Sequence, residues 1–145
     1  MSKPGKVILK WTDFGRLMND LIDKLKYARL PVTHVYGPPV GGVFVAGVIA
    51  NKLNLKYVTF TGPLILKPKR LLIVDDLTDT GQTMRDLIPE QYRNDVYTAA
   101  LYWKPHKNGS KWKPNVFVHQ TLNWIVFPWE RLDEKPNRPG YEHLE

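Results

Sequence analysis

Residues 71–83 read Leu-Leu-Ile-Val-Asp-Asp-Leu-Thr-Asp-Thr-Gly-Gln-Thr and decide the fold. The apolar run within residues 70–74 is typical of a strand covered on both faces, as in a parallel sheet, and it leads directly into Asp75 and Asp76. Ligands of open α/β sheets bind beyond the carboxyl ends of the strands, so both carboxylates are predicted to lie at a ligand site. Because neighbouring side chains of an extended segment point in opposite directions, the pair can accept hydrogen bonds from two vicinal hydroxyls or reach a Mg²⁺ ion.

The residues after this strand have the composition of a phosphate-binding turn. Residues 79–83 lead into a helix predicted over residues 81–88, and backbone N–H groups together with the helix dipole attract an anion at such a turn. Gly81 lets the backbone approach a ligand closely, and the hydroxyls of Thr80 and Thr83 can donate hydrogen bonds. A ribose with a 5-phosphate therefore fits the segment, with its diol on the carboxylates and its phosphate on the turn.

Three other interpretations of this segment compete with a sugar-phosphate site. An apolar strand followed by aspartate also occurs in nucleotide triphosphatases, but the chain has no G-x-x-x-x-G-K-[ST] loop. Asp-Asp-x-x-Asp also occurs on helices that bind diphosphates, whereas here it follows a strand and precedes Thr80-Gly81. The structural alternative is a strand followed by a capped turn, with Asp79 as the N-cap of the helix.

Strands and helices alternate along the rest of the chain, which predicts an α/β fold with a mostly parallel sheet. Apolar residues at helical spacing predict an amphipathic helix over residues 13–29. The other predicted elements are a strand at 33–36, a turn at 37–42, a buried helix at 43–53, and strands at 56–60, 96–103, 116–118 and 124–127.

Length and composition restrict the class of protein. The 145 residues suit one domain. The absence of cysteine excludes a disulfide framework, a thiolate metal site and a cysteine nucleophile. No apolar run approaches the roughly 18 residues that a membrane span needs, and no signal peptide is visible, so a cytoplasmic protein without a membrane partner is expected.

The net charge of +7 is unevenly distributed. Residues 31–70 carry five bases and no acid, residues 71–100 carry six acids and two bases, and residues 101–128 carry four bases and no acid. Evenly spread basic residues would indicate a nucleic-acid surface. Carboxylates between two basic stretches instead indicate an anionic ligand that is bound together with a metal ion. We therefore do not expect nucleic acid to be the partner.

The segment 71–83 resembles the phosphoribosyl pyrophosphate motif of type I phosphoribosyltransferases, and the likeness extends from about Val7 to Glu130. Residues 7–11 followed by an amphipathic helix, and Trp124-Ile125-Val126-Phe127-Pro128-Trp129-Glu130, resemble the start and the C-terminal signature of xanthine–guanine phosphoribosyltransferases and their relatives. The resemblance implies an α/β phosphoribosyltransferase domain over residues 1–130, with a small hood formed by residues 104–130 and the N-terminal strand, and a surface tail at 131–145. It also implies a dimer or tetramer.

The resemblance implies a pentosyltransferase that acts on phosphoribosyl pyrophosphate and a 6-oxopurine base. Asp79 would be the general acid/base at the purine N7, and Asp75 and Asp76 would bind the ribose hydroxyls and help to hold Mg²⁺. The remaining implied contacts are the 5-phosphate on Asp79, Thr80, Gly81, Gln82 and Thr83, pyrophosphate on Pro39, Val40, Gly41 and Gly42 in a loop that often has an unusual peptide geometry, the purine O6 on Lys104, ring stacking on Trp124, and the base edge on the backbone of Ile125.

The chain departs from this family at two places. Val40 stands where relatives carry arginine or lysine, and residues 61–69 are short for the loop that closes over the site. These departures motivate an alternative function, namely a non-catalytic module that binds a nucleotide or phosphoribosyl pyrophosphate. On the residues alone, Lys104 could also be a solvated side chain, Trp124 a core residue, and Gly41-Gly42 a tight turn.

Overall fold

The structure is a computed structural model that describes residues 5–59, 70–105 and 112–131. The loop expected over residues 61–69 and the expected tail beyond Arg131 lie outside these ranges. The elements, in chain order, are β1 (Lys6–Ile8), α1 (Trp11–Ala28), β2 (His34–Tyr36), α2 (Gly41–Leu53), β3 (Lys56–Tyr57), β4 (Leu71–Thr78), α3 (Gln82–Leu87), the short 3-10 helix η3 (Glu90–Tyr92), β5 (Tyr97–Trp103), β6 (Val116–Gln120), β7 (Trp124–Val126) and the short 3-10 helix η4 (Pro128–Arg131).

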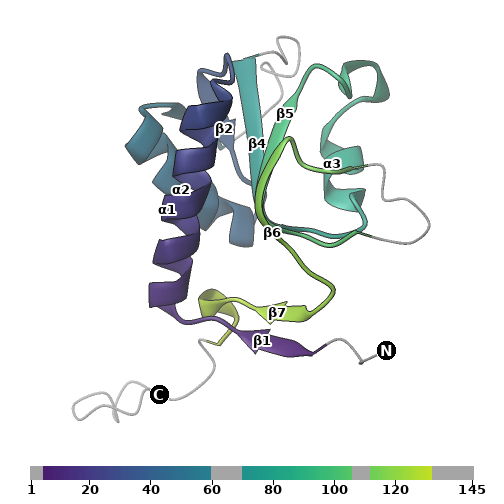
Figure 1. Cartoon of the computed structure of the whole chain (residues 1–145). Helices are drawn as coiled ribbons and strands as arrows, with labels where there is room; N and C mark the ends of the chain where they lie inside the picture. The colour runs from purple at the N-terminus through teal and green to yellow at the C-terminus, as the bar shows by residue number, and fades with distance from the viewer. Residues whose placement is uncertain (1–4, 60–69, 106–111, 132–145) are drawn as a thin grey trace, which may run out of the picture.

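The central sheet has five parallel strands in the order β3-β2-β4-β5-β6 (Figure 1). The chain moves outward from β2 to β3 through α2, and in the opposite direction from β4 to β5 through α3. The strand order therefore reverses between β2 and β4. In open α/β sheets the crevice at such a reversal, beyond the carboxyl ends of the strands, is where ligands bind.

The two faces of the sheet bury different layers of helix. Leu72 and Val74 of β4 belong to the core that α1 and α2 cover, while Leu71 and Ile73 belong to a smaller core with Met84 of α3. Figure 1 shows α1 and α2 on one side of the sheet and α3 on the other. A strand buried on both faces explains the continuous apolar run in the sequence.

A second, two-stranded sheet lies below the carboxyl ends of the central strands (Figure 1). It pairs β1 with β7 in parallel, from Lys6–Trp124 to Ile8–Val126. This small sheet corresponds to the expected hood. The hood was expected to include residues 104–130, but β6, which falls in that range, is the edge strand of the central sheet. Ile125 and Phe127 are buried in the same core as α1 and α2, which attaches the small sheet to the large one.

Trp129 of η4 packs between the small sheet and the helices α1 and α2. Its ring is stacked on Phe44 of α2 at 4.5 Å and 8°, and on Phe127 at 5.0 Å and 6°. Phe14 and Trp11 of α1 approach the same indole at 5.4 and 6.1 Å. Four aromatic residues from three parts of the chain thus surround one side chain, and stacked or edge-on pairs of this kind add stability beyond the area they bury.

Element boundaries differ from the expected ones where a specific contact extends an element. The strand expected at residues 70–74 continues to Thr78, because its backbone stays paired with β5 as far as Trp103. The first helix begins at Trp11 rather than at residue 13, since the carboxylate of Asp13 accepts a 2.7 Å hydrogen bond from the N–H of Lys10. The buried helix begins at Gly41 rather than at residue 43.

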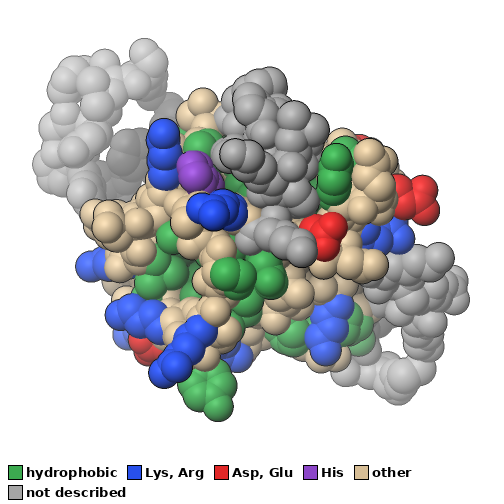
Figure 2. Space-filling view, turned by 90° about the horizontal axis from the view of Figure 1, so that it is seen from above, with side chains coloured by type: hydrophobic (Ala, Val, Ile, Leu, Met, Phe, Trp, Pro, Cys, Tyr) green, Lys and Arg blue, Asp and Glu red, His purple; other side chains and the backbone are tan. Residues whose placement is uncertain are grey.

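The end of the molecule opposite the small sheet carries several of the basic side chains. Figure 2 shows this end from above, with Lys and Arg side chains spread among hydrophobic and polar ones. Lys56 begins β3 and Arg70 precedes β4, and both are exposed. No helix within the described parts of the chain is long and apolar enough to cross a membrane.

We expect Trp129→Ala to lower the free energy of unfolding by about 3 kcal/mol, because it removes the ring on which the other aromatic side chains pack. Urea denaturation measures the change. Trp124→Ala is the matched control: that indole is 66% exposed, so its removal should change stability by less than about 0.5 kcal/mol. Equal losses in the two variants would contradict the role given to Trp129.

Candidate active site

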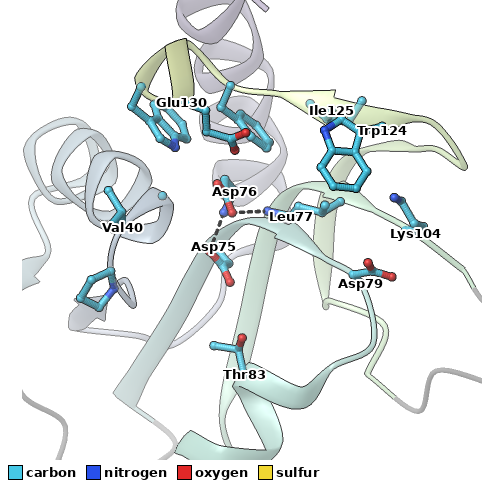
Figure 3. A pocket seen from close by; sticks show the side chains of 14 residues that line it. Val40, Asp75, Asp76, Leu77, Asp79, Thr83, Lys104, Trp124, Ile125 and Glu130 are labelled. Atoms are coloured by element: carbon cyan, nitrogen blue, oxygen red, sulfur yellow. Dashed lines mark hydrogen bonds between the residues drawn. The ribbon is translucent and has the colours of Figure 1, made fainter. Parts of the chain in front are cut away.

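Asp75 and Asp76 lie within β4, near its carboxyl end, and point in opposite directions. Figure 3 shows Asp76 facing Glu130 and the small sheet, and Asp75 on the side of the strand where Thr83 lies. The carboxylate of Asp75 accepts a 2.9 Å hydrogen bond from the N–H of Asp76, and that of Asp76 accepts a 2.7 Å bond from the N–H of Leu77. These bonds hold one oxygen of each carboxylate against the backbone.

Burial disfavours the state in which Asp75 and Asp76 are both ionised. Burial, and next the charge of Asp76, raises the pKa of Asp75 to about 8. Burial also raises the pKa of Asp76. Desolvation disfavours the charged form of a carboxyl group, and a neighbouring anion adds to the effect. A bound cation would favour the ionised forms of both.

The acid pair is suited to a Mg²⁺ ion whose other ligands come mainly from a phosphorylated substrate and from water. Carboxylate oxygens are the ligands that Mg²⁺ prefers, and one or two of them with substrate phosphates and waters are a common set. The described residues contain no group of three or more His, Asp or Glu side chains that could hold a metal alone. Asp75 and Asp76 could therefore help to bind a metal carried by a phosphorylated ligand.

The loop before α2 meets the acid pair directly. The Pro39–Val40 peptide bond is cis, which matches the unusual geometry that the resemblance implies. A Cβ atom added at Gly41 would collide with the carboxylate of Asp76, so only glycine lets the helix start this close to the acid. The N–H of Gly42 donates to the carbonyl of Pro38 at 3.0 Å, and Val40 is 66% exposed.

The turn after β4 forms a small cavity of about 80 Å³. Gly81 has a φ of +80° and is the N-cap of α3, so the alternative with Asp79 as N-cap is wrong. A side chain at Gly81 would also collide with Trp112. The Thr80 hydroxyl accepts a 3.2 Å bond from the N–H of Gln82. The residues lining the cavity are Asp75, Leu77, Thr78, Asp79, Thr80, Gly81, Gln82, Thr83 and Met84.

A larger cavity of about 480 Å³ joins three of the predicted groups of residues. It lies between the end of β4, the start of α2 and the small sheet (Figure 3). Of the predicted site residues, its lining includes Pro39, Val40, Gly41, Asp75, Asp76, Asp79, Thr83, Lys104, Trp124 and Ile125. Thr80, Gly81 and Gln82 line only the small cavity, and Gly42 lines neither of the two.

The base-side residues are held at the ends of three strands. The N–H of Lys104 donates to the carbonyl of Thr78 at 2.9 Å, which places the lysine directly after β5 and beside the end of β4. Trp124 of β7 is exposed, and Figure 3 shows its indole near Lys104 and Leu77. The alternative of Trp124 as a core residue is therefore wrong, since its side chain is exposed and lines the cavity.

Four further residues line the large cavity without having been predicted as ligands: Leu77, Phe127, Trp129 and Glu130. Trp129 lines the cavity and also packs in the core, where its ring is stacked on Phe44 and Phe127. Burial, and next the charge of Asp76, raises the pKa of the Glu130 carboxyl. Glu130 ends the C-terminal signature in the sequence, which was the available signal for its place in the site.

Charge in the large cavity is predominantly acidic. Asp75, Asp76, Asp79 and Glu130 line it, and among the described residues Lys104 is the only lysine or arginine in its lining. The basic stretch 31–70 was expected to surround the ligand, but Lys52, Lys56 and Arg70, its described members, do not line this cavity. A polyanionic ligand therefore needs a metal ion, or N–H and O–H donors, to balance its charge here.

We expect Asp75→Asn to stabilise the ligand-free protein, and to do so more at high pH. The folded pKa of about 8 exceeds the ordinary value of 3.8. The stabilising contribution of the protonated carboxyl is therefore complete below pH 4 and is lost as the pH rises through 8. Asparagine keeps the oxygen that accepts from the N–H of Asp76 but carries no charge.

Urea unfolding with a metal chelator present should show a gain of about 1–3 kcal/mol at pH 8.5 and much less at pH 4.5. Asp20→Asn, at an exposed position of α1, is the control and should change the free energy of unfolding by less than about 0.5 kcal/mol. An equal gain at both pH values would contradict the raised pKa.

Comparisons with known proteins agree with this geometry. The phosphoribosyl transferase domain family matches residues 60–134, just over half of the chain. A purine phosphoribosyltransferase structure from Pyrococcus horikoshii is 26% identical, with a TM-score of 0.66 over 86% of this chain and 93% of that one. Other similar structures are less than 25% identical and show the fold alone. They include structures described as orotate and adenine phosphoribosyltransferases.

Two bacterial structures cover most of both chains. A Neisseria gonorrhoeae protein solved with bound ppGpp is 19% identical, with a TM-score of 0.72 over 92% of this chain and 93% of its own. The Helicobacter pylori xanthine–guanine–hypoxanthine phosphoribosyltransferase is 18% identical, with a TM-score of 0.64 over 86% and 93%. Together with the family match, these likenesses assign the protein: it belongs to the phosphoribosyl transferase domain family and is a phosphoribosyltransferase of the type I fold.

Proposed function

We propose that the protein transfers the 5-phosphoribosyl group from phosphoribosyl pyrophosphate to a 6-oxopurine base, giving a nucleoside 5′-monophosphate and pyrophosphate. One observation carries the proposal: a single cavity is lined by the acid pair of β4, the cis-peptide loop before α2, Lys104 and Trp124. A sugar on the acids, a diphosphate on the loop and a planar base on the indole would then be neighbours. The similarity to a purine phosphoribosyltransferase supports the choice of a purine.

Asp79 and Lys104 would control the proton and the charge of the base. The new bond forms between a purine ring nitrogen and the anomeric carbon, while the bond from that carbon to pyrophosphate breaks. Asp79 would take the proton that leaves the purine N7, and the ammonium of Lys104 would donate a hydrogen bond to O6. Both side chains line the cavity. Thr78 precedes Asp79 in the chain, so the hydrogen bond from the Lys104 N–H to the Thr78 carbonyl holds the backbones of the two residues close together.

The leaving group would be received at the start of α2. Mg²⁺, when bound with the substrate, would neutralise charge on the pyrophosphate as it departs. Asp75 and Asp76 would hold the ribose hydroxyls and orient the sugar between loop and base. The backbone of Ile125, which is buried beside Trp124, would hydrogen-bond the edge of the base.

Asp79→Asn should lower kcat by about 10²–10⁴-fold, the usual contribution of one positioned acid or base. Pyrophosphate release is measured with Mg²⁺, phosphoribosyl pyrophosphate and a panel of guanine, hypoxanthine, xanthine, adenine and orotate. Asp23→Asn, on the exposed side of α1, should behave like the unchanged protein. An unchanged rate in Asp79→Asn would contradict its acid/base role, and turnover of only adenine or orotate would overturn the 6-oxopurine proposal.

Trp124→Ala should raise the KM for the base about tenfold or more, because base–aromatic stacking contributes about 1–3 kcal/mol. The KM for phosphoribosyl pyrophosphate should change little. Trp124→Phe, which keeps an aromatic face, should restore most of the affinity for the base. Equal effects on both KM values would mean that the indole does not stack on the base.

The same assay distinguishes the proposed transferase from a binding module. Two observations favour the module as the second candidate: the described lining of the cavity contains a single lysine, and Val40 stands in its loop. Binding of phosphoribosyl pyrophosphate in a calorimeter without turnover of any base would support it. Turnover of a 6-oxopurine would exclude it.

A further inference from the structure

Thr78 carries a hydroxyl group that the proposed chemistry does not use. It is the last residue of β4 and is 5% exposed. Its Oγ1 is buried and has no hydrogen-bond partner among the described residues. A buried hydroxyl without a partner costs about 1–3 kcal/mol, and a valine of nearly the same shape would avoid that cost. Such a group in a native structure calls for an explanation.

No neighbour in the sheet satisfies this hydroxyl. Its partner in the register of β4 and β5 is Trp103. The indole nitrogen of Trp103 is likewise buried without a hydrogen-bond partner among the described residues. The other buried threonine of the sheet differs: Thr98, which is 4% exposed, accepts a 3.4 Å bond from the N–H of Asn115 and lies 3.5 Å from its side-chain oxygen.

Thr78 lines the small cavity of about 80 Å³ beside the turn of residues 79–83. A water molecule occupies about 30 Å³ of liquid, so the space admits a group of a few heavy atoms. Its described lining holds the carboxylates of Asp75 and Asp79 but no lysine or arginine. An anionic group in this cavity must therefore be held by N–H and O–H donors.

Two backbone N–H groups at this turn already have acceptors within the protein. The N–H of Gln82 is already bonded to the Thr80 hydroxyl, and that of Arg85 to the Gly81 carbonyl. The Thr78 hydroxyl is a donor without an acceptor next to a space that requires donors. Its oxygen is sealed from bulk water, so a ligand reaches it only when the turn adjusts around that ligand or when the side chain exchanges the positions of its hydroxyl and methyl groups.

We propose that the Thr78 hydroxyl donates a hydrogen bond to the 5-phosphate of the substrate, as a further binding residue at the end of β4. The inference rests on the proposed function, because it takes the turn of residues 79–83 as the phosphate site. Hydrogen bonds to a charged phosphate are stronger than those between neutral groups. The bound phosphate would thus supply the acceptor that Thr78 lacks in the free protein.

The test compares Thr78→Val with Thr78→Ser in affinity and in stability. Calorimetric titration with ribose 5-phosphate in the presence of Mg²⁺ measures phosphate binding without involving the base. We expect Thr78→Val to bind about tenfold or more weakly and to raise the Tm of the free protein by about 2–4 °C. Thr78→Ser, which keeps the donor, should retain most of the affinity.

Thr98→Val is the matched control, because it removes a buried threonine hydroxyl that has partners. It should lower the Tm and leave the affinity for ribose 5-phosphate unchanged. Wild-type affinity in Thr78→Val would overturn the inference while turnover of a base still supported the proposed function. A lower Tm in both Thr78 variants would also overturn it, since the hydroxyl would then be structural. No binding of ribose 5-phosphate to the unchanged protein would overturn both.

Discussion

The close approach of Gly41 to the carboxylate of Asp76 determines how the site is arranged. A side chain at residue 41 would occupy the space of that carboxylate, so the glycine brings the first turn of α2 against the end of β4. β2 and β4 are neighbours at the point where the strand order reverses. The loop after β2 and the acids of β4 consequently open into one cavity, and the small sheet closes its third side.

The small sheet keeps its place through apolar contacts rather than through the site itself. Within the described residues, β1 and β7 pair only with each other, and the stack of Phe44, Trp129 and Phe127 connects them to α2. Phe44 belongs to the helix that begins at Gly41, and Trp129 precedes Glu130 in the cavity lining. The distance between the loop side and the base side of the cavity is therefore set by aromatic packing.

Sequence reasoning succeeded where the signal is local. The apolar run, the acids at its end and the turn at Gly81 predict the strand, the ligand edge and the helix start within a few residues. It failed where a residue far along the chain determines the local structure. β4 extends to Thr78 because β5 pairs with it, and β6 joins the central sheet instead of the hood. Gly81 is required because a side chain there would collide with Trp112. Glu130 enters the site for the same reason, through the packing of Trp129.

Charge explains why such a site suits a substrate that carries its own metal. Of the described residues, four carboxylates and one lysine line the large cavity, and burial already favours protonation of Asp75 and Asp76. A bare diphosphate would meet like charge at this site. A diphosphate bound to a metal ion would bring a cation, which would favour the ionised forms of both acids and reduce the net charge of the diphosphate. Val40 adds no positive charge to the loop before α2, so a metal ion carried by the substrate would have to balance the charge of a diphosphate there. Under the proposed function, the sugar phosphate would be bound by neutral donors in the turn after β4, because none of the described residues that line the small cavity is a lysine or arginine.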